Sequence, residues 1–210
     1  MIYFDYAATS KKRKYIFEEM LKNFDDFNGN PGSVHASGRS AKKLLENARK
    51  KIADYIGANE KSIVFTSGGS EANNTVLNAF NKKGYEIISS RIEHPSILQP
   101  LKNSESDIIL LNSNQDGQVD LNELRHAISE KTKLISVIFV NNETGIIQPI
   151  KEIREIIGEK DIWLHIDAVQ ALGHIEINIE ELGCDSMSFS GHKLGGMNGF
   201  GVLYIRENLK

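Results

Sequence analysis

A lysine near the C-terminal end of the sequence has surroundings that suit covalent chemistry. Lys193 follows the run 186–190, which resembles a buried strand, and has glycines at Gly191, Gly195 and Gly196. Partial burial among such neighbours would lower the pKa of the amine and make it a usable nucleophile for a carbonyl carbon. A lone lysine is more often a solvated surface charge, but these neighbours favour the reactive amine.

A carboxylate occupies a comparable position. Asp167 comes at the end of the apolar run 163–167, and open α/β sheets bind their ligands at the C-terminal ends of strands. A buried carboxylate is costly unless a positive group pairs with it. A protonated ring nitrogen would serve, and the carboxylate would raise the pKa of that nitrogen. The alternative is a helix N-cap, because aspartate is a favoured capping residue.

A glycine-containing turn is the third candidate. The segment 66–74 reads Thr-Ser-Gly-Gly-Ser-Glu-Ala-Asn-Asn, follows a predicted strand and opens a helix. Its glycines let the backbone approach an anion closely, and the free N–H groups of a helix N-terminus favour a phosphate. Gly69 and Ser70 lie at the centre of this segment. The same pattern also fits an ordinary strand-to-helix turn.

Two further strand ends carry polar side chains. His94, in Glu93-His94-Pro95, can stack on an aromatic ligand, act as an acid or base, or cap the helix that follows. Asn141 and Asn142 follow another apolar run. Their amides can hold a ligand hydroxyl or carboxylate, or satisfy the backbone of their own loop.

Short β-branched runs that alternate with helical segments must position these residues. An apolar stripe predicts a helix over 38–56, a capping-box pattern opens another over 121–128, and a third covers 150–157. Residues 24–37 are predicted to form a long loop. The predicted strands are 62–66, 86–90, 107–111, 134–140, 163–167, 186–190 and 201–206.

Several of these strands are apolar throughout, as strands covered on both faces are. Strand–helix alternation then predicts an α/β fold with a mostly parallel, seven-stranded sheet. The C-terminal ends of parallel strands meet at one edge of a sheet. We therefore expect the candidate residues to converge there on one site.

Composition excludes several classes of protein. The 25 basic and 28 acidic side chains give a formal net charge of −3, which provides no electrostatic reason to expect a nucleic acid or an anionic membrane as partner. No stretch approaches the roughly 20 apolar residues that cross a bilayer, and the N-terminus has no signal-peptide pattern. Cys184 is the single cysteine, so we expect neither a disulfide nor a metal site. A cytoplasmic enzyme or binding protein is the expectation.

These segments, in this order, resemble the cysteine desulfurase family, the NifS/IscS-like members of the class V aminotransferase group of fold-type I enzymes that use pyridoxal 5'-phosphate (PLP). The similarity extends over nearly the whole chain. The matching segments are 4–9, 29–31, 67–74, 93–95, 141–143, 167–170, 190–193 and 201–204. The resemblance implies a three-layer α/β/α architecture, the fold-type I large domain.

The resemblance also implies a role for each matched residue. Lys193 would form the Schiff base with PLP, Asp167 would keep the pyridinium nitrogen protonated, and His94 would stack on the ring and help move protons. Gln170 would hydrogen-bond the ring hydroxyl, with Asn142 near that hydroxyl and the substrate. The phosphate would be held by Gly69, Ser70, Ser190 and His192.

The sequence departs from the family in two places. The family usually has Gly-Pro-Lys-Gly after the lysine, whereas this chain has Gly196-Met197-Asn198-Gly199, in a loop near the substrate entrance. In the family, a C-terminal domain supplies the nucleophilic cysteine, an arginine for the substrate carboxylate and a Ser/Thr that reaches the partner subunit's phosphate. We expect residues 1–210 to be the PLP-binding large domain with an N-terminal arm over about 1–37, and the C-terminal small domain to be absent.

The leading hypothesis is therefore a PLP-dependent cysteine desulfurase, which converts L-cysteine to L-alanine and a persulfide sulfur, here as an inactive large domain. The resemblance implies a homodimer, a sulfur-acceptor or scaffold protein as partner, and a role in iron–sulfur cluster assembly. Cys184 precedes the strand that leads to Lys193, so we interpret it as a half-buried packing residue. The alternatives are a selenocysteine lyase or aminotransferase of the same class, and a folded fragment without chemistry.

Overall fold

A single sheet forms the centre of the molecule in the computed structural model, which describes residues 2–207. Seven strands of this part of the chain pair in the order β1-β7-β6-β5-β4-β2-β3. Strand β7 runs antiparallel to both of its neighbours, and the other pairs are parallel. The strands are β1 (Ile63–Thr66), β2 (Glu86–Ser90), β3 (Asp107–Leu111), β4 (Thr132–Ile138), β5 (Trp163–Asp167), β6 (Ser186–Ser190) and β7 (Gly201–Ile205). The predicted mostly parallel sheet is confirmed.

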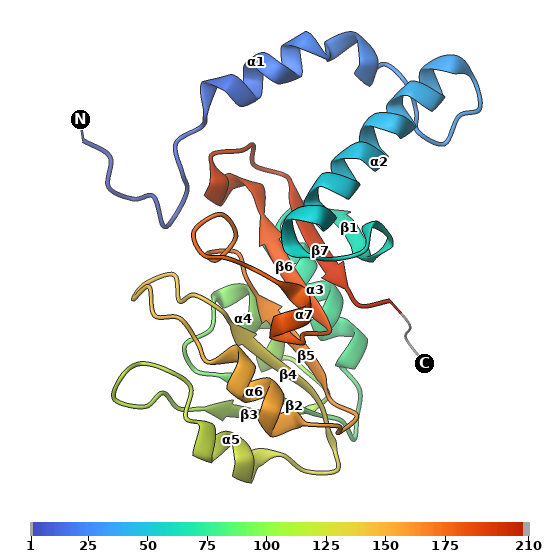
Figure 1. Cartoon of the computed structure of the whole chain (residues 1–210). Helices are drawn as coiled ribbons and strands as arrows, with labels where there is room; N and C mark the ends of the chain where they lie inside the picture. The colour runs from blue at the N-terminus through green and yellow to red at the C-terminus, as the bar shows by residue number, and fades with distance from the viewer. Residues whose placement is uncertain (1, 208–210) are drawn as a thin grey trace.

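Helices cover both faces of the sheet (Figure 1). One face packs against α3 (Gly69–Phe80) and α4 (Pro95–Lys102) through Ile87 and Leu134, and the opposite face buries Ile135 and Val137 in a larger core. That larger core includes residues of α2 (Ala36–Ile56), α5 (Leu121–Ala127), α6 (Ile150–Ile157) and α7 (Ile179–Leu182). Neighbouring residues of a strand point to opposite faces, so the continuous apolar runs supply both cores. The structure is the expected three-layer α/β/α architecture.

Element boundaries agree with the sequence prediction to within a few residues. Strand β4 begins two residues before the predicted 134 and ends at Ile138, after which Val140 makes only an isolated bridge to Ile147. Helix α5 begins as predicted, because Asp120 accepts hydrogen bonds from the first N–H groups of the helix. In the second hydrogen bond of a capping box, Glu123 would accept from the N–H of Asp120. Here Glu123 instead accepts from the N–H of Asn112 (2.7 Å).

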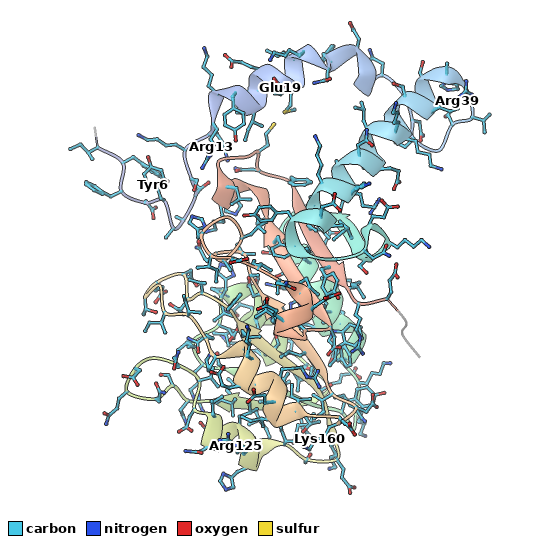
Figure 2. All side chains as sticks on the ribbon, in the orientation of Figure 1. Tyr6, Arg13, Glu19, Arg39, Arg125 and Lys160 are labelled. Carbon is cyan, nitrogen blue, oxygen red and sulfur yellow. The ribbon has the colours of Figure 1, made fainter. Side chains whose placement is uncertain are left out.

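The N-terminal segment differs from the rest of the chain. Helix α1 (Lys14–Lys22) buries no residue and lies away from the sheet (Figure 1). Figure 2 shows the side chains of Glu19, on α1, and Arg39, in the first turn of α2, at the same outlying end of the molecule. The loop predicted over 24–37 is shorter than expected, because Phe24–Phe27 forms a 3-10 turn, η1, and α2 begins at Ala36.

Two more 3-10 turns complete the described secondary structure, η2 (Glu60–Ser62) before β1 and η3 (Gly191–Leu194) after β6. None of the helices in this part of the chain is both long and apolar enough to cross a lipid bilayer.

The burial of β5 can be tested with two leucine variants. Leu164 on β5 is 0 % exposed, whereas Leu21 on α1 is 72 % exposed. We expect Leu164→Ala to lower the free energy of unfolding by about 2–5 kcal/mol, because it leaves a cavity in the core. Leu21→Ala should change it by no more than about 0.5 kcal/mol. Urea denaturation measures both, and equal losses would contradict the packing described for β5.

Candidate active site

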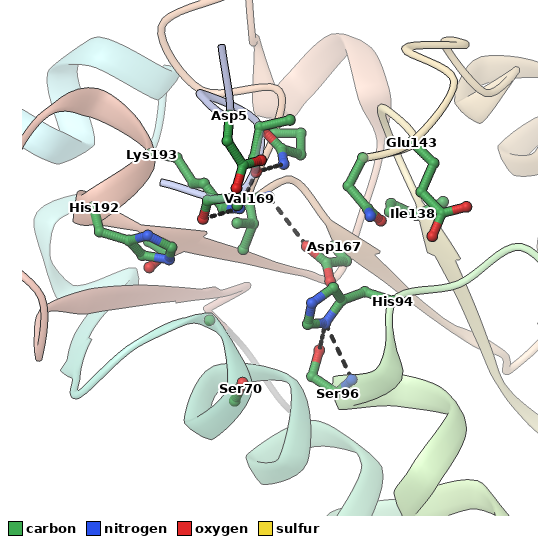
Figure 3. A pocket seen from close by; sticks show the side chains of 16 residues that line it. Asp5, Ser70, His94, Ser96, Ile138, Glu143, Asp167, Val169, His192 and Lys193 are labelled. Carbon is green, nitrogen blue, oxygen red and sulfur yellow. Dashed lines mark hydrogen bonds between the residues drawn. The ribbon is translucent and has the colours of Figure 1, made fainter. Parts of the chain in front are cut away.

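A pocket of about 520 Å³ opens at the C-terminal edge of the parallel strands. It contains every residue to which the family resemblance assigns a role. These are Gly69, Ser70, His94, Asn142, Asp167, Gln170, Ser190, His192 and Lys193. In the view of Figure 3, Lys193 and His192 lie on the left of the pocket, Asp167 and His94 near its centre, and Ser70 below. The structure thus brings the predicted residues together, whereas their individual roles remain proposals.

Asp167 is the last residue of β5 and is only 2 % exposed. Its Oδ2 accepts from the side-chain amide of Asn73 (2.8 Å), and its Oδ1 accepts from the N–H of Val169 (3.1 Å). Both donors are uncharged, so neither neutralises the carboxylate. Burial accordingly raises the pKa of Asp167, although His94 and Lys193 oppose that shift. The predicted capping role of Asp167 involves only its Oδ1, which accepts from the backbone N–H of Val169.

Lys193 lies in η3, directly after β6. Its Nζ donates to the carbonyl oxygen of Ala8 (2.9 Å) and also to that of Ala7, in the turn over residues 6–8 that precedes α1. Partial burial lowers the pKa of this amine, while the carboxylates of Asp167 and Asp5 act in the opposite direction. Lys193 is therefore held at the pocket by backbone carbonyls from the N-terminal segment and is not a solvated surface charge.

The N-terminus of α3 forms another wall of the pocket. Its N-cap is Gly68, which offers no side-chain cap, and the N–H of Ala72 makes the first intrahelical bond (3.2 Å) to Gly68. The preceding N–H groups, at Gly69 and Ser70, belong to the orphan donors of a helix start. A Cβ at Gly69 would lie 2.5 Å from Cγ2 of Val169, so any larger residue there would require the Val169 side chain to move. Such a turn can receive an anion.

The alternatives for the other two strand ends are resolved differently. His94 lines the pocket and also caps α4, because its Nδ1 accepts from the N–H of Ser96 (3.1 Å). Asn141 serves its own loop, since its Oδ1 accepts from the N–H groups of Glu143 (3.0 Å) and Thr144 (2.9 Å). Asn142 is the amide that lines the pocket.

The remaining predicted residues also contact the N-terminal segment. Gln170 donates through Nε2 to the carbonyl of Ala7 (2.8 Å), and Nδ1 of His192 lies 3.2 Å from Oγ1 of Thr9. Burial lowers the pKa of His192, and the adjacent charge of Lys193 lowers it further. Ser190 is buried at the end of β6.

Sequence reasoning missed two kinds of contributor. Asn73 contacts Asp167, and the available signal was a polar residue next to Ala72 on the buried face of α3. Ala7 and Ala8 act through backbone carbonyls, for which side-chain type gives no signal.

The site combines three chemical functions. The N-terminus of α3 suits an anion, the buried carboxylate of Asp167 suits a protonated ring nitrogen, and the amine of Lys193 suits a carbonyl carbon. These residues fit a small phosphorylated aromatic aldehyde that carries a basic ring nitrogen.

Known proteins were compared with the chain in sequence and in structure. The family described as Aminotransferase class-V matches residues 2–210, and the chain belongs to this family. Curated relatives named cysteine desulfurase IscS, from Dictyoglomus turgidum and Methanosarcina thermophila, are each 44 % identical over 216 residues and aligned to 100 % of the chain.

Solved structures agree with this assignment. A structure entitled "SspA in complex with cysteine" superposes with a TM-score of 0.92 at 34 % identity, and covers 99 % of this chain and 62 % of its own. A NifS-like protein has a TM-score of 0.91 at 35 % identity, over 99 % and 59 %. The chain has the fold of NifS-like, fold-type I enzymes. It spans about half the length of the curated relatives, 55 % and 54 % of the two named above.

The electrostatic link between Asp167 and Lys193 can be measured directly. We expect the amine of Lys193 to titrate below its ordinary pKa of 10.5. Asp167→Asn should lower that pKa further, because the carboxylate that favours the charged amine is removed. Carbon-13 NMR titration of the reductively methylated chain reports both values, with Lys193→Ala to identify the signal. An unchanged or raised pKa in Asp167→Asn would contradict the arrangement.

Proposed function

We propose that this chain binds PLP and is the cofactor-binding part of a cysteine desulfurase. The observation that carries the proposal is the meeting, in one pocket, of a partly buried lysine amine, a buried carboxylate whose hydrogen-bond donors are uncharged, and an uncapped helix N-terminus. When bound, PLP supplies an aldehyde for amines and a ring that withdraws electrons. The similarity to cysteine desulfurases named IscS supports the assignment.

In this proposal, different ends of the pocket bind the ring nitrogen and the phosphate of the cofactor. Asp167 pairs with the ring nitrogen and keeps its proton in place. Gly69 and Ser70 bind the phosphate through backbone N–H groups, and Ser190 and His192 hold it from the opposite wall.

The remaining residues act at the ring and at the substrate. Lys193 would hold the aldehyde through Nζ, and its free amine would serve as the base for the proton on the substrate Cα. His94 stacks on the ring and moves protons, while Gln170 and Asn142 orient the ring hydroxyl.

The reaction that we propose for the whole protein is sulfur transfer from L-cysteine. A thiol attacks the cysteine sulfur, the Cβ–S bond breaks, and the products are L-alanine and a persulfide on that thiol. The relative solved with cysteine supports this substrate class. Cys184 is not the attacking thiol, because it is buried and burial raises its pKa to about 12. We infer that the thiol lies on a C-terminal domain outside residues 1–210, and that this chain alone does not complete the reaction.

We further propose that the protein is a cytoplasmic homodimer that passes sulfur to an acceptor or scaffold protein in iron–sulfur cluster assembly. Exposed apolar side chains gather in the N-terminal part of the chain and favour self-association. They include Ile2, Phe4, Phe24 and Val34. Sedimentation equilibrium should therefore yield twice the chain mass of 23.5 kDa, and a monomer at micromolar concentration would contradict the dimer.

The proposal is tested by trapping PLP on the chain. Borohydride reduction after incubation with PLP should attach one pyridoxyl group, and peptide mass mapping should locate it on Lys193. The label should disappear in Lys193→Ala, because Lys193 is the one lysine among the described residues that line the pocket. Lys14→Ala is the matched control, since the Lys14 side chain is 91 % exposed, and it should keep the label. A label that persists in Lys193→Ala, or that is spread over surface lysines, would overturn the proposal.

A further inference from the structure

A row of polar side chains lies beneath the pocket, on the face of β5 that packs against α3. Trp163, His165 and Asp167 alternate along β5 and so point to the same face. Four residue-to-residue steps along the strand lead from the first to the last, a span of about 13 Å. His165 is fully buried, and polar groups at that depth need hydrogen-bond partners.

The hydrogen bonds of this row have a direction that begins at Trp163. The indole Nε1–H, which can only donate, donates to Oγ of Ser186 (2.7 Å) on the neighbouring strand β6. Ser186 Oγ lies 2.8 Å from Nδ1 of His165 and has one hydrogen of its own, which it can direct to that nitrogen. Burial lowers the pKa of His165 to about 3, so its ring carries one proton. With Nδ1 accepting, that proton belongs on Nε2.

Asn73 on α3 accepts a hydrogen bond from this Nε2–H through its amide oxygen, and its amide nitrogen acts as the next donor. Nε2 of His165 lies 3.1 Å from Oδ1 of Asn73, so the amide oxygen faces the histidine. The amide nitrogen then donates to Oδ2 of Asp167 (2.8 Å) and to Oγ of Ser96 (2.9 Å). A rotated amide would put its oxygen against the carboxylate and its N–H₂ against an N–H. The carboxylate, which can only accept, fixes the same direction from the other end.

The second donor of Asn73 leads to His94. Because Ser96 accepts from Asn73, its hydroxyl hydrogen is free to donate to Nδ1 of His94, 2.8 Å away. The backbone N–H of Ser96 donates to the same nitrogen (3.1 Å). Nδ1 of His94 is thus an acceptor on the helix side, which leaves Nε2 as the nitrogen available for a ring hydrogen.

We propose that Asn73 is a positioning residue for the ring-binding site. Its amide oxygen faces His165, which is linked through Ser186 to Trp163. Its amide nitrogen donates to Asp167 and to Ser96, the hydrogen-bond partner of His94. Its effect on the cofactor rests on the proposed function, whereas the hydrogen-bond row itself does not. The amide orients the carboxylate of Asp167 and supports its ionised form while leaving lone pairs of that carboxylate open to the pocket. Through Ser96 it also supports one tautomer of His94.

The direction of the row can be read without any cofactor. Long-range proton–nitrogen NMR spectra of the unmodified chain at neutral pH report which ring nitrogen of each histidine is protonated. His165 is assigned through its contacts with Trp163 and Asn73. We expect the proton of His165 on Nε2 and a bare Nδ1. A proton on Nδ1 would overturn the proposal, because Asn73 would then have to turn its oxygen toward Asp167.

The positioning role is tested by Asn73→Leu, which keeps the volume and removes the amide. Loss of a hydrogen bond to a charged group should weaken the affinity for PLP by about tenfold or more. The ring signal of His165 should also shift, because Nε2 loses its acceptor. The matched control is Asn78→Leu, an exposed asparagine on the same helix, which should change neither quantity.

Ser96→Ala distinguishes the contact of Asn73 with His165 from its contact with His94 through Ser96. It should alter the ring signal of His94 and leave that of His165 in place, since the bond from His165 to Asn73 is kept. Folded Asn73→Leu with unchanged PLP affinity would overturn the positioning role. If Asn73→Leu does not fold, the tautomer of His165 in the unmodified chain still decides the proposal. Failure of the unmodified chain to bind PLP would instead refute the proposed function and leave the tautomer result standing.

Discussion

The burial of the Asp167 carboxylate, whose hydrogen-bond donors are uncharged, is the constraint around which the site is organised. Asp167 receives hydrogen bonds only from an amide and a backbone N–H, and burial raises its pKa. In a protein interior such a group is stable only if its oxygens are well paired or a positive group is brought to it. The pocket leaves one side of Asp167 open, so the missing positive charge can be supplied by a ligand. A protonated ring nitrogen is the group that the surroundings suit best.

Helix α3 serves this site at two points. Its uncapped first turn, at Gly69 and Ser70, presents N–H groups to the pocket, and one turn further on Asn73 reaches the carboxylate at the end of β5. The relative placement of an anion-binding turn and Asp167 is therefore set by a rigid element and not by loops. The amine at the other end is less rigidly placed, because Lys193 follows a strand on a 3-10 turn and is held by carbonyls of the N-terminal segment.

Much of this arrangement could be predicted from the sequence, because it depends on local patterns. Apolar runs followed by polar residues place Asp167, Asn142 and Lys193 at strand ends, and parallel strands bring those ends to one edge. The pattern could not separate Asn141 from Asn142, which are identical side chains one residue apart. Only the course of the loop decides that Asn141 binds its own backbone and that Asn142 faces the pocket.

The contacts that sequence reasoning missed join residues far apart in the chain. The bond from Asn73 to Asp167 spans 94 positions, and that from Lys193 to Ala8 spans 185. Each depends on how a helix or an extended segment lies across the sheet, which side-chain types alone do not determine. The N-terminal helix α1 went unpredicted although Ile16, Phe17, Met20 and Leu21 recur at helical spacing, and in the structure it buries none of them.

The central claim is that one small molecule joins the amine of Lys193 to the carboxylate of Asp167. A crystal structure of the chain grown with PLP tests it most directly. The account predicts continuous density from Nζ of Lys193 to the cofactor, the ring nitrogen within about 2.7–3.2 Å of an Asp167 oxygen, and the phosphate at the N-terminus of α3. A cofactor bound with its ring nitrogen turned away from Asp167, or bound outside this pocket, would contradict it.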